Sequence, residues 1–362
     1  NVRGKQRMMS LGKHGAVTCE QARKIAQQYL GELASGKAPY LERQPEAGMT
    51  VADLCHEYFE EAEAGRVLYR GRTKKASTLA IDKGRIERHI IPLLGAVPIQ
   101  DLKRNEVERF MHDVAEGKTK AQVKTGTHGL ANVRGGSGTA KKCVSLLGAI
   151  YGYAIRKGYV EHNPCRDIEK PRDGVRERFL SPPEYQALGK VIRAAIEGRR
   201  SGFAPHVILA LALTGCRRNE MLTLERSMVD FEDGALRFTD TKTGAQVRPC
   251  GSAALSALKD VSESHSSEWM FPARGNESHL VNIRKPMLAL CEEAGLNDVT
   301  PHTLRHSFAS VAHELGYSEL TIAGLLGHRA ATVTGRYAHH VDHALRDAAD
   351  RVSNTIAERL GW

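Results

Sequence analysis

The sequence lacks the features that mark membrane, disulfide-bonded and metal-binding proteins. Its seven cysteines are odd in number, widely scattered and never arranged as C-x-x-C, which argues against a disulfide framework or a zinc cage and indicates a reducing cytosol. The longest strongly apolar run, Val207 to Leu213, is much shorter than the roughly 18 residues of a membrane span. No signal peptide is visible. We therefore expect a cytoplasmic protein with no membrane partner.

Positive charge, by contrast, is in excess. The 362 residues include 52 Lys and Arg against 42 Asp and Glu, which gives a formal net charge of +10. An excess of this sign favours a polyanionic partner, and nucleic acid is the first candidate. A hydrophobic content of 41% is enough to build cores, and the length indicates two or three domains.

The N-terminal piece, residues 1–45, opens with a basic stretch and contains one expected helix, from Thr18 to Ala34. Thr18 is followed three residues later by Gln21, a pair that resembles a capping box. The piece is too small to form a robust domain alone.

A second unit, residues 49–165, shows four amphipathic helices and almost no strand signal, so we expect a small helical bundle. Its second helix is expected to stop at Pro92, because proline removes a helical hydrogen bond. Residues 117–138, between the third and fourth helices, are either a solvated flexible loop or a basic loop that follows a phosphate backbone. The candidate DNA-binding side chains of this segment and of the following helix are Lys118, Lys120, Lys124, Arg134, Lys141 and Lys142.

A linker is expected over residues 166–178, where polar and helix-breaking residues cluster. The third unit, residues 179–362, combines helices with a short β region around Val229 to Arg248, which is expected to turn at Lys242. Further helices are expected at Leu280–Ala294, Leu304–Leu315, Glu319–Leu326 and His343–Leu360. The chain should be mainly α with a small β-sheet.

Four short segments of the third unit carry residues that suit one chemistry. They are Thr214-Gly215-Cys216-Arg217-Arg218-Asn219-Glu220, Lys242, His302-Thr303-Leu304-Arg305-His306, and Leu325-Leu326-Gly327-His328 with Arg336-Tyr337-Ala338-His339. Exchange of a phosphodiester passes through a state with extra negative charge, which the planar guanidinium groups of Arg217 and Arg305 could hold. Taken alone, an arginine is more often ion-paired or solvated.

Tyr337 would be the nucleophile of such an exchange. A phenol with a pKa of about 10 is mostly protonated at neutral pH and needs a base and nearby positive charge. His302 could accept its proton, and His328 could donate a hydrogen bond to the phosphate. Lys242 could give a proton to the departing 5′ hydroxyl. In isolation a tyrosine is more often a packed aromatic and a histidine more often a satisfied structural residue, whereas a turn lysine is about as often simply solvated.

Glu220 lies three residues after Arg217 on the same helical face and is expected to support the basic residues. His306 follows His302 by four residues, but Thr303 stands where a zinc protease carries Glu, so His306 is expected to be structural. No acidic cluster suggests magnesium, and we expect neither a metal nor a cofactor.

Together these segments resemble the tyrosine recombinase (phage integrase) family, because T-G-x-R-x-x-E, H-x-L-R-H and L-G-H followed by Y-x-H occur in the family's order. Arg134-Gly135-Gly136-Ser137-Gly138-Thr139-Ala140 and Asn163-Pro164 are similar to integrases of genomic islands. The resemblance implies an arm-DNA-binding remnant at the N-terminus, a helical core-binding (SAM-like) domain and an α+β catalytic domain. The catalytic residues that it implies are Arg217, Lys242, His302, Arg305, His328 and Tyr337.

The resemblance implies site-specific cleavage and rejoining of DNA through a 3′-phosphotyrosyl intermediate, by two domains that clamp the duplex at the bacterial nucleoid. It also implies a homotetramer on two attachment sites, with DNA-bending accessory proteins as further partners. The amphipathic stripe of Ala344–Leu360 would then dock on a neighbouring protomer, and the alternative is that it packs on its own domain. Two other functions stay open: a type IB topoisomerase, or a non-catalytic DNA-binding regulator.

Overall fold

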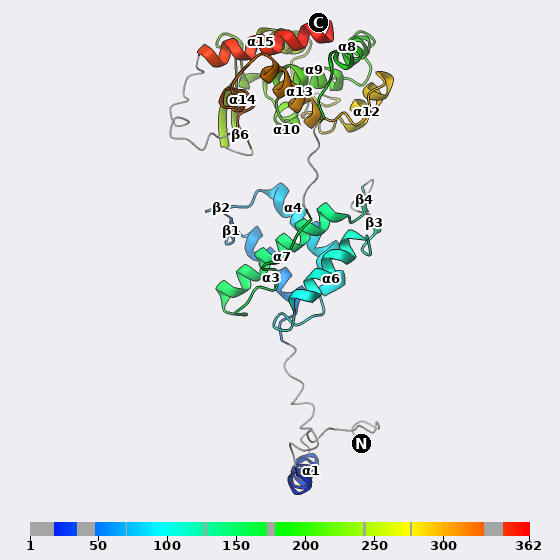
Figure 1. Ribbon diagram of the computed structural model, residues 1–362, viewed down its shortest axis with the longest axis vertical. Helices are drawn as coiled ribbons and strands as arrows, with labels where there is room; N and C mark the ends of the chain where they lie inside the picture. The colour runs from blue at the N-terminus through cyan, green and yellow to red at the C-terminus, as the bar shows by residue number, and fades with distance from the viewer. Residues whose placement is uncertain are drawn as a thin grey trace. The chain divides into compact units, whose positions relative to one another are not determined.

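The computed structural model describes residues 18–34, 48–69, 71–124, 126, 129–171, 178–241, 244–275, 277–328 and 343–362. The chain divides into two compact units, residues 1–174 and residues 175–362 (Figure 1). Helices dominate both units, and the described strands form two two-stranded sheets and one three-stranded sheet. The expected mainly α fold with little β structure is confirmed. No helix in the described ranges is long and apolar enough to cross a membrane.

Helix α1 (Cys19–Ala34) begins where its capping residues predict. The backbone N–H of Gln21 donates to Thr18 Oγ1 at 3.3 Å, and the backbone N–H of Thr18 donates to Gln21 Oε1 at 2.9 Å. Two backbone donors at the start of the helix are thereby satisfied. The capping box predicted from the sequence is confirmed.

The other helices of the first unit pack around one apolar core. They are α3 (Val51–Glu63), α4 (Ala76–Arg85), the π-helix η1 (Ile86–Ile90), α5 (Ile91–Leu94), α6 (Arg104–Ala115) and α7 (Ser137–Lys157). On α7 the side chains of Val144, Leu147, Ile150 and Ala154 recur at helical spacing and are fully buried. They pack against α6 and α3, and the expected helical bundle is present with its core.

The second predicted helix does not stop at Pro92 but continues for one more turn. Residues of η1 form a π-turn, in which the N–H of Ile91 donates to the carbonyl oxygen of Ile86. Pro92 then stands in the first turn of α5, where its missing N–H leaves no helical bond unmade. The prediction was wrong because proline ends a helix only where its N–H is needed.

Two β-hairpins interrupt the bundle where the sequence showed almost no strand signal. β1 (Leu68–Tyr69) pairs with β2 (Arg72–Thr73), and β3 (Ala121–Lys124) pairs antiparallel with β4 (Leu130–Val133) within the basic segment. At the base of the second hairpin Gly135 has φ +76°, and a Cβ there would overlap the carbonyl oxygen of Val114. This glycine therefore permits close approach to the end of α6. Such short strands escape prediction because backbone pairing holds them, not an alternating apolar face.

The second unit surrounds one central helix, α9 (Ala204–Thr214), in which every residue from Val207 to Thr214 is buried. Around it lie α8 (Pro182–Glu197), α10 (Arg218–Leu222), α11 (Ser252–Glu263), α12 (Arg284–Glu293), α13 (Pro301–Glu314), α14 (Glu319–Leu326) and α15 (His343–Leu360). After the short 3₁₀ helix η2 (Arg226–Met228), strands β5 (Val229–Asp230), β6 (Ala235–Thr241) and β7 (Gly244–Pro249) form an antiparallel sheet in chain order. Thr241 pairs with Gly244, which confirms the predicted hairpin.

Helix α15 buries its apolar stripe inside its own unit. Ala348, Val352, Ile356 and Leu360 are at most 2% exposed, and the helix contacts α8, α9, α11, α13 and α14. In the single chain the stripe packs on its own domain, which is the alternative that the sequence left open, and docking on a neighbouring protomer stays a prediction. An amphipathic stripe shows that a face is buried but does not select the partner that covers it.

Gly189 on α8 sets how closely α15 can approach, because a Cβ on Gly189 would overlap the carbonyl oxygen of Leu360. Gly189→Ala should lower the unfolding free energy of the second unit by about 1–3 kcal/mol, the usual cost of overpacking. Calorimetry would measure the shift of that unit's transition. Gly152→Ala on α7 is the control, because the atom nearest to the added Cβ is the end of Arg156, at 3.8 Å. The unfolding free energy of the first unit should therefore rise by about 0.5–1 kcal/mol. An unchanged transition in Gly189→Ala would contradict the packing.

Candidate active site

The candidate site is built at the C-terminal ends of two helices. α9 ends at Gly215 (φ +61°) and α14 ends at Gly327 (φ +64°), both in the left-handed conformation that glycine adopts without strain. The guanidinium group of Arg305, on α13, donates from Nη1 to the carbonyl oxygen of Gly215 at 2.7 Å and from Nη2 to that of Leu326 at 2.9 Å. One side chain thus fastens two helix ends to a third helix.

Arg305 is 4% exposed, and its charge is stabilised by those helix ends. The C-terminal end of a helix carries partial negative charge, so each carbonyl favours the guanidinium. Burial, followed by the positive charge of Arg217, lowers the pKa of Arg305 to about 10. A group with that pKa stays charged at neutral pH, and the site therefore keeps its buried cation.

Arg217 begins α10 and is held by Glu220. Its backbone N–H donates to Glu220 Oε2 at 2.8 Å, and its Nη1 donates to Glu220 Oε1 at 2.8 Å. A guanidinium has five N–H groups, and within the described part of the chain one of those of Arg217 donates to a side chain, that of Glu220. The Arg217 side chain is 26% exposed, so it is the guanidinium that a ligand can reach. Gly215 stands two residues before Arg217. A Cβ at this position would lie 2.8 Å from the Phe308 ring, so only glycine fits there.

His328 follows the end of α14 and contacts Arg305. Nη2 of Arg305 donates to His328 Nε2 at 2.9 Å. Since a guanidinium has no acceptor, Nε2 is the acceptor and a neutral ring carries its proton on Nδ1. Partial burial, then the charges of Arg305 and Arg217, lower the pKa of His328. The ring is therefore neutral at pH 7 and can donate from Nδ1.

His302 lies in the first turn of α13, one turn before Arg305. Partial burial, then the charges of His306, Arg305 and Arg217, lower the pKa of His302, so the ring is neutral at pH 7 and can accept a proton. The rings of His302 and His306 meet edge to face, with their centroids 4.6 Å apart. His306, which the sequence suggested to be structural, thus helps to orient His302.

Arg248 is the residue of this site that the sequence reasoning missed. It lies on β7, is 1% exposed, and its Nη2 forms an ion pair with Glu220 Oε2 at 2.6 Å. Its guanidinium also lies over the Phe238 ring, 4.9 Å from the centroid, and Nη1 contacts Cys216 Sγ at 3.4 Å. Burial opposes ionisation of Glu220, but Arg248 and then Arg217 outweigh it and lower the pKa of that carboxyl. An arginine in a strand gave no signal for this role.

The structure brings Arg217, Glu220, Arg305 and His328 into one cluster, and His302 lies within electrostatic reach of both arginines. Two of the predicted catalytic residues, Lys242 and Tyr337, lie outside the described residues. Among the described residues no group of three or more His, Cys, Asp or Glu could hold a metal ion.

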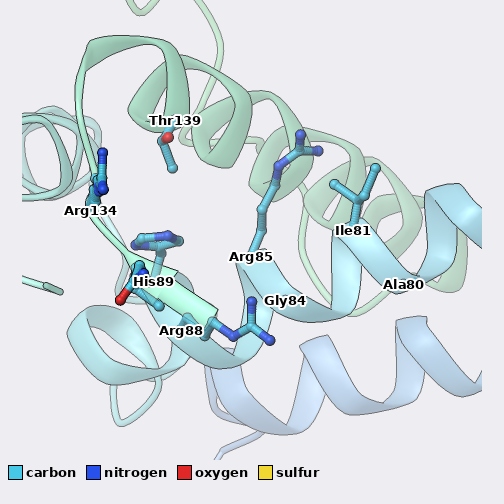
Figure 2. A pocket seen from close by; sticks show the side chains of 11 residues that line it. Ala80, Ile81, Gly84, Arg85, Arg88, His89, Arg134 and Thr139 are labelled. Atoms are coloured by element: carbon cyan, nitrogen blue, oxygen red, sulfur yellow. The ribbon is translucent and has the colours of Figure 1, made fainter. Parts of the chain in front are cut away.

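The DNA-binding candidates lie in the first unit, and most of them line two cavities. Arg134 lines the first cavity, which Figure 2 shows, while Lys118, Lys120 and Lys124 line the second. Lys141 and Lys142, in the first turns of α7, line neither cavity. Both cavities are also lined by Arg88, and the first by Arg85. The sequence reasoning missed these two arginines because they look like the solvated face of an ordinary helix.

Two arginines, two neutral histidines and a carboxylate in contact with one of the arginines, Arg217, make up a site that suits chemistry on a phosphodiester, carried by a mixed α and β unit. Residues 178–343 match the phage integrase family, and residues 1–46 match an arm DNA-binding domain. The chain belongs to the tyrosine recombinase (phage integrase) family.

Relatives of known name cover different parts of the chain. It is 27% identical over 189 residues to tyrosine recombinase XerC of Roseiflexus sp. (strain RS-1), which covers 48% of this chain and 59% of that protein. It is 20% identical over 324 residues to the integrase of Shigella phage Sf6, which covers 86% of this chain and 76% of that protein. The fold is similar to lambda integrase in a tetramer bound to a Holliday junction, with a TM-score of 0.61, 20% identity, and coverage of 87% of this chain and 89% of that one.

We predict that His302 and His328 titrate below about 6.5, the pKa of an unperturbed imidazole. The unfolded chain then binds these protons more readily than the folded protein. Their contribution to the unfolding free energy should be constant above pH 7 and should fall as the pH drops below about 6.5. NMR titration of the imidazole C–H signals measures both pKa values.

The matched pair of variants is Arg217→Gln and Arg218→Gln. The charge of Arg217 opposes protonation of both histidines, so its removal should raise both pKa values. Arg218 is its exposed neighbour and should have no such effect. Equal pKa values in the two variants would contradict the electrostatic arrangement of the site.

Proposed function

We propose that the protein is a site-specific DNA recombinase that cleaves and rejoins double-stranded DNA through a 3′-phosphotyrosyl intermediate. The observation that carries the proposal is the convergence of Arg217, Arg305 and His328, from three separate segments, around the ends of α9 and α14. The chain spans 59% of the length of the XerC relative, so activity, substrate and partners are proposed for the whole protein on these grounds.

The two arginines have different tasks. Among the described residues, Arg305 donates from three of its five N–H groups, to Gly215, Leu326 and His328. Arg217 donates from one side-chain N–H group to a described residue and is more exposed, so it makes the main contact with the non-bridging phosphate oxygens. Arg305 adds a second fixed charge behind it. Donors that are already in place stabilise the developing negative charge without a reorganisation cost.

The reaction moves two protons, one from the nucleophile and one to the leaving group. The Oη atom of Tyr337 attacks the phosphorus, the bond from phosphorus to the 5′ oxygen breaks, and the phenol proton passes to His302. His328 donates from Nδ1 to the phosphate. Lys242 gives a proton to the departing 5′ oxygen. In the second step a 5′ hydroxyl of the partner duplex attacks the phosphotyrosyl bond and restores Tyr337, so the phosphodiester energy is kept and no external energy source is needed.

Strand exchange requires two duplexes, and we propose a homotetramer on DNA at the nucleoid. The stripe of α15 is buried in its own unit. Contact between protomers through α15 would therefore require the helix to leave this core and to bind at the equivalent position on a neighbouring protomer. Exchange of an identical element between protomers is a low-cost route to assembly, since the contacts are unchanged. Accessory proteins that bend the DNA remain part of the proposal.

The decisive test is Tyr337→Phe on a nicked suicide substrate that carries the protein's own attachment site. The variant should bind the duplex with wild-type affinity but form no covalent adduct, because only the hydroxyl is lost. The adduct is measured by denaturing electrophoresis. Tyr317→Phe, a tyrosine of the same unit that lies over Arg351, is the control and should form the adduct normally.

An adduct that persists in Tyr337→Phe would overturn the assignment of the nucleophile. Relaxation of a plasmid that lacks any attachment site would instead favour a topoisomerase. Binding without cleavage by the wild-type protein at every flanking site of its gene would favour a regulator.

A further inference from the structure

Two adjoining cavities of the first unit share the side chain of Arg88. The first, of about 470 Å³, lies between the α4–η1 segment and the junction of β4 with α7. Figure 2 shows Arg85 and Arg88 extending from one side of this cavity and Arg134 and Thr139 from the other. Three cationic side chains, two from the α4–η1 segment and one from the junction of β4 with α7, therefore line one small space.

The second cavity, of about 720 Å³, is also lined by Arg88. Its cationic lining comes from the segment that leads into β3 and from β3 itself, namely Lys118, Lys120 and Lys124. Among the described residues, Glu87 is the acidic side chain of these two linings. Arg88 therefore lines two positively charged spaces at once.

Little of this charge is neutralised by the protein. Two carboxylates nearby are already paired, Asp82 with Arg85 at 3.2 Å and Asp113 with Lys118 at 2.5 Å. In the described part of the chain, four cations of the cavities have no carboxylate partner: Arg88, Arg134, Lys120 and Lys124. Unpaired like charges held close together favour an anion from outside.

His89 connects the two cavities and senses their charge. It lines the first cavity, is 6% exposed, and its Nδ1 lies 2.6 Å from Oγ1 of Thr119, which lines the second. Burial, then the charges of Arg88 and Arg85, lower the pKa of His89. An anion bound at Arg88 would offset these charges and raise that pKa.

We propose that the two cavities hold phosphate groups of one DNA strand, with Arg88 between them. The inference rests on the proposed function for the identity of the polyanion. Guanidinium and ammonium groups only donate and match phosphate oxygens, whereas reading base edges needs donors and acceptors in fixed combination. The cavities therefore add affinity and register without sequence preference.

The test compares Arg88→Gln with Arg156→Gln, which removes the same charge from an exposed position in the last turn of α7. Binding of the full chain to duplex DNA is measured as a function of salt. Arg88→Gln should reduce the slope of log K against log salt by about 1, and should weaken cognate and unrelated duplexes by the same factor. Arg156→Gln should leave the slope unchanged. Addition of duplex should raise the pKa of His89 in the wild-type protein, as followed by NMR.

Duplexes in which single phosphates are replaced by neutral methylphosphonates locate the contact. At the contacted phosphate the replacement should weaken the wild-type protein but cost Arg88→Gln nothing further, because the interaction is already lost. Equal salt slopes for both variants, in a protein that still forms the covalent adduct, would overturn the cavity assignment and leave the function intact. A loss confined to the cognate duplex would also overturn it, in favour of base reading. A wild-type protein that binds no duplex would overturn both.

A second, independent observation concerns Arg248, and we propose that it is a positioning residue for both Arg217 and His328. Glu220 is shared: its Oε1 accepts from Arg217 and its Oε2 pairs with Arg248. The buried Arg248 thus fixes the carboxylate of Glu220, and this carboxylate in turn holds Arg217, the arginine that faces the ligand. It also lowers the pKa of that carboxyl, which keeps Glu220 charged.

The same side chain packs against the turn that carries His328. A Cβ on Gly327 would overlap Nε of Arg248, so the turn and the guanidinium are fitted to each other. Gln246 accepts from Arg248 Nε at 3.2 Å and donates from Nε2 to the carbonyl oxygen of Gly327 at 3.1 Å. Arg248 therefore touches the supports of two active-site groups without being placed to touch the substrate.

Arg248→Met should slow covalent adduct formation by about 10²-fold, the effect of a misplacement near 1 Å, while Kd for the duplex stays within twofold. Arg248→Lys should recover part of the rate, because an ammonium can still pair with Glu220. The fraction folded is measured by circular dichroism for each variant. A wild-type rate in Arg248→Met would overturn the proposal, and so would a loss of rate and of binding that both follow the fraction folded.

Where Arg248→Met is too unstable, Glu220→Gln/Arg248→Met removes both buried charges and avoids an uncompensated one. It should fold and should show the same split between slow cleavage and normal binding. Fast cleavage in this double variant would overturn the proposal.

Discussion

The buried guanidinium group of Arg305 is the constraint on which the site depends. A charge removed from water must be compensated, and no carboxylate pairs with Arg305 among the described residues. The compensation comes from carbonyl oxygens at the C-terminal ends of α9 and α14. Both helices must therefore end at this point, and both end at a left-handed glycine. The same two ends deliver Arg217 and His328, so stabilising one buried charge also assembles the site.

The charge balance of the cluster follows from this arrangement. Glu220 is the carboxylate that contacts Arg217 and Arg248, and Arg305 adds a third positive charge beside them. Partial burial, and then this excess of positive charge, lower the pKa of His302 and of His328 and keep both rings neutral. One imidazole can therefore accept a proton, and the other has a defined N–H donor. A surplus of fixed positive charge with neutral proton carriers suits a phosphodiester, whose charge grows during the reaction.

Much of this site could be predicted from the sequence, because its groups stand in short motifs that contain both the end of a helix and a functional side chain. The seven residues from Thr214 to Glu220 include Gly215, which ends α9, Arg217, and Glu220, which caps α10. Arg248, by contrast, could not be predicted, since an arginine in a strand usually faces solvent and only the packing of β7 places it under Glu220 and over Phe238. Arg85 and Arg88 were missed for a related reason: cationic residues on a helix gain meaning only from the hairpin opposite.

The sequence by itself determined the helices, their caps and the chemical character of the site, because these depend on neighbours within a few residues along the chain. Val207 to Thr214 had to be buried, and Thr18 had to begin a helix. The tertiary structure alone decided that α15 packs on α8 within the single chain, that the helix runs through Pro92, and that a glycine-rich basic segment pairs as a hairpin against α6. The periodicity of apolar residues determines which face of a helix is buried. The surface that covers this face depends on contacts between residues far apart in the sequence.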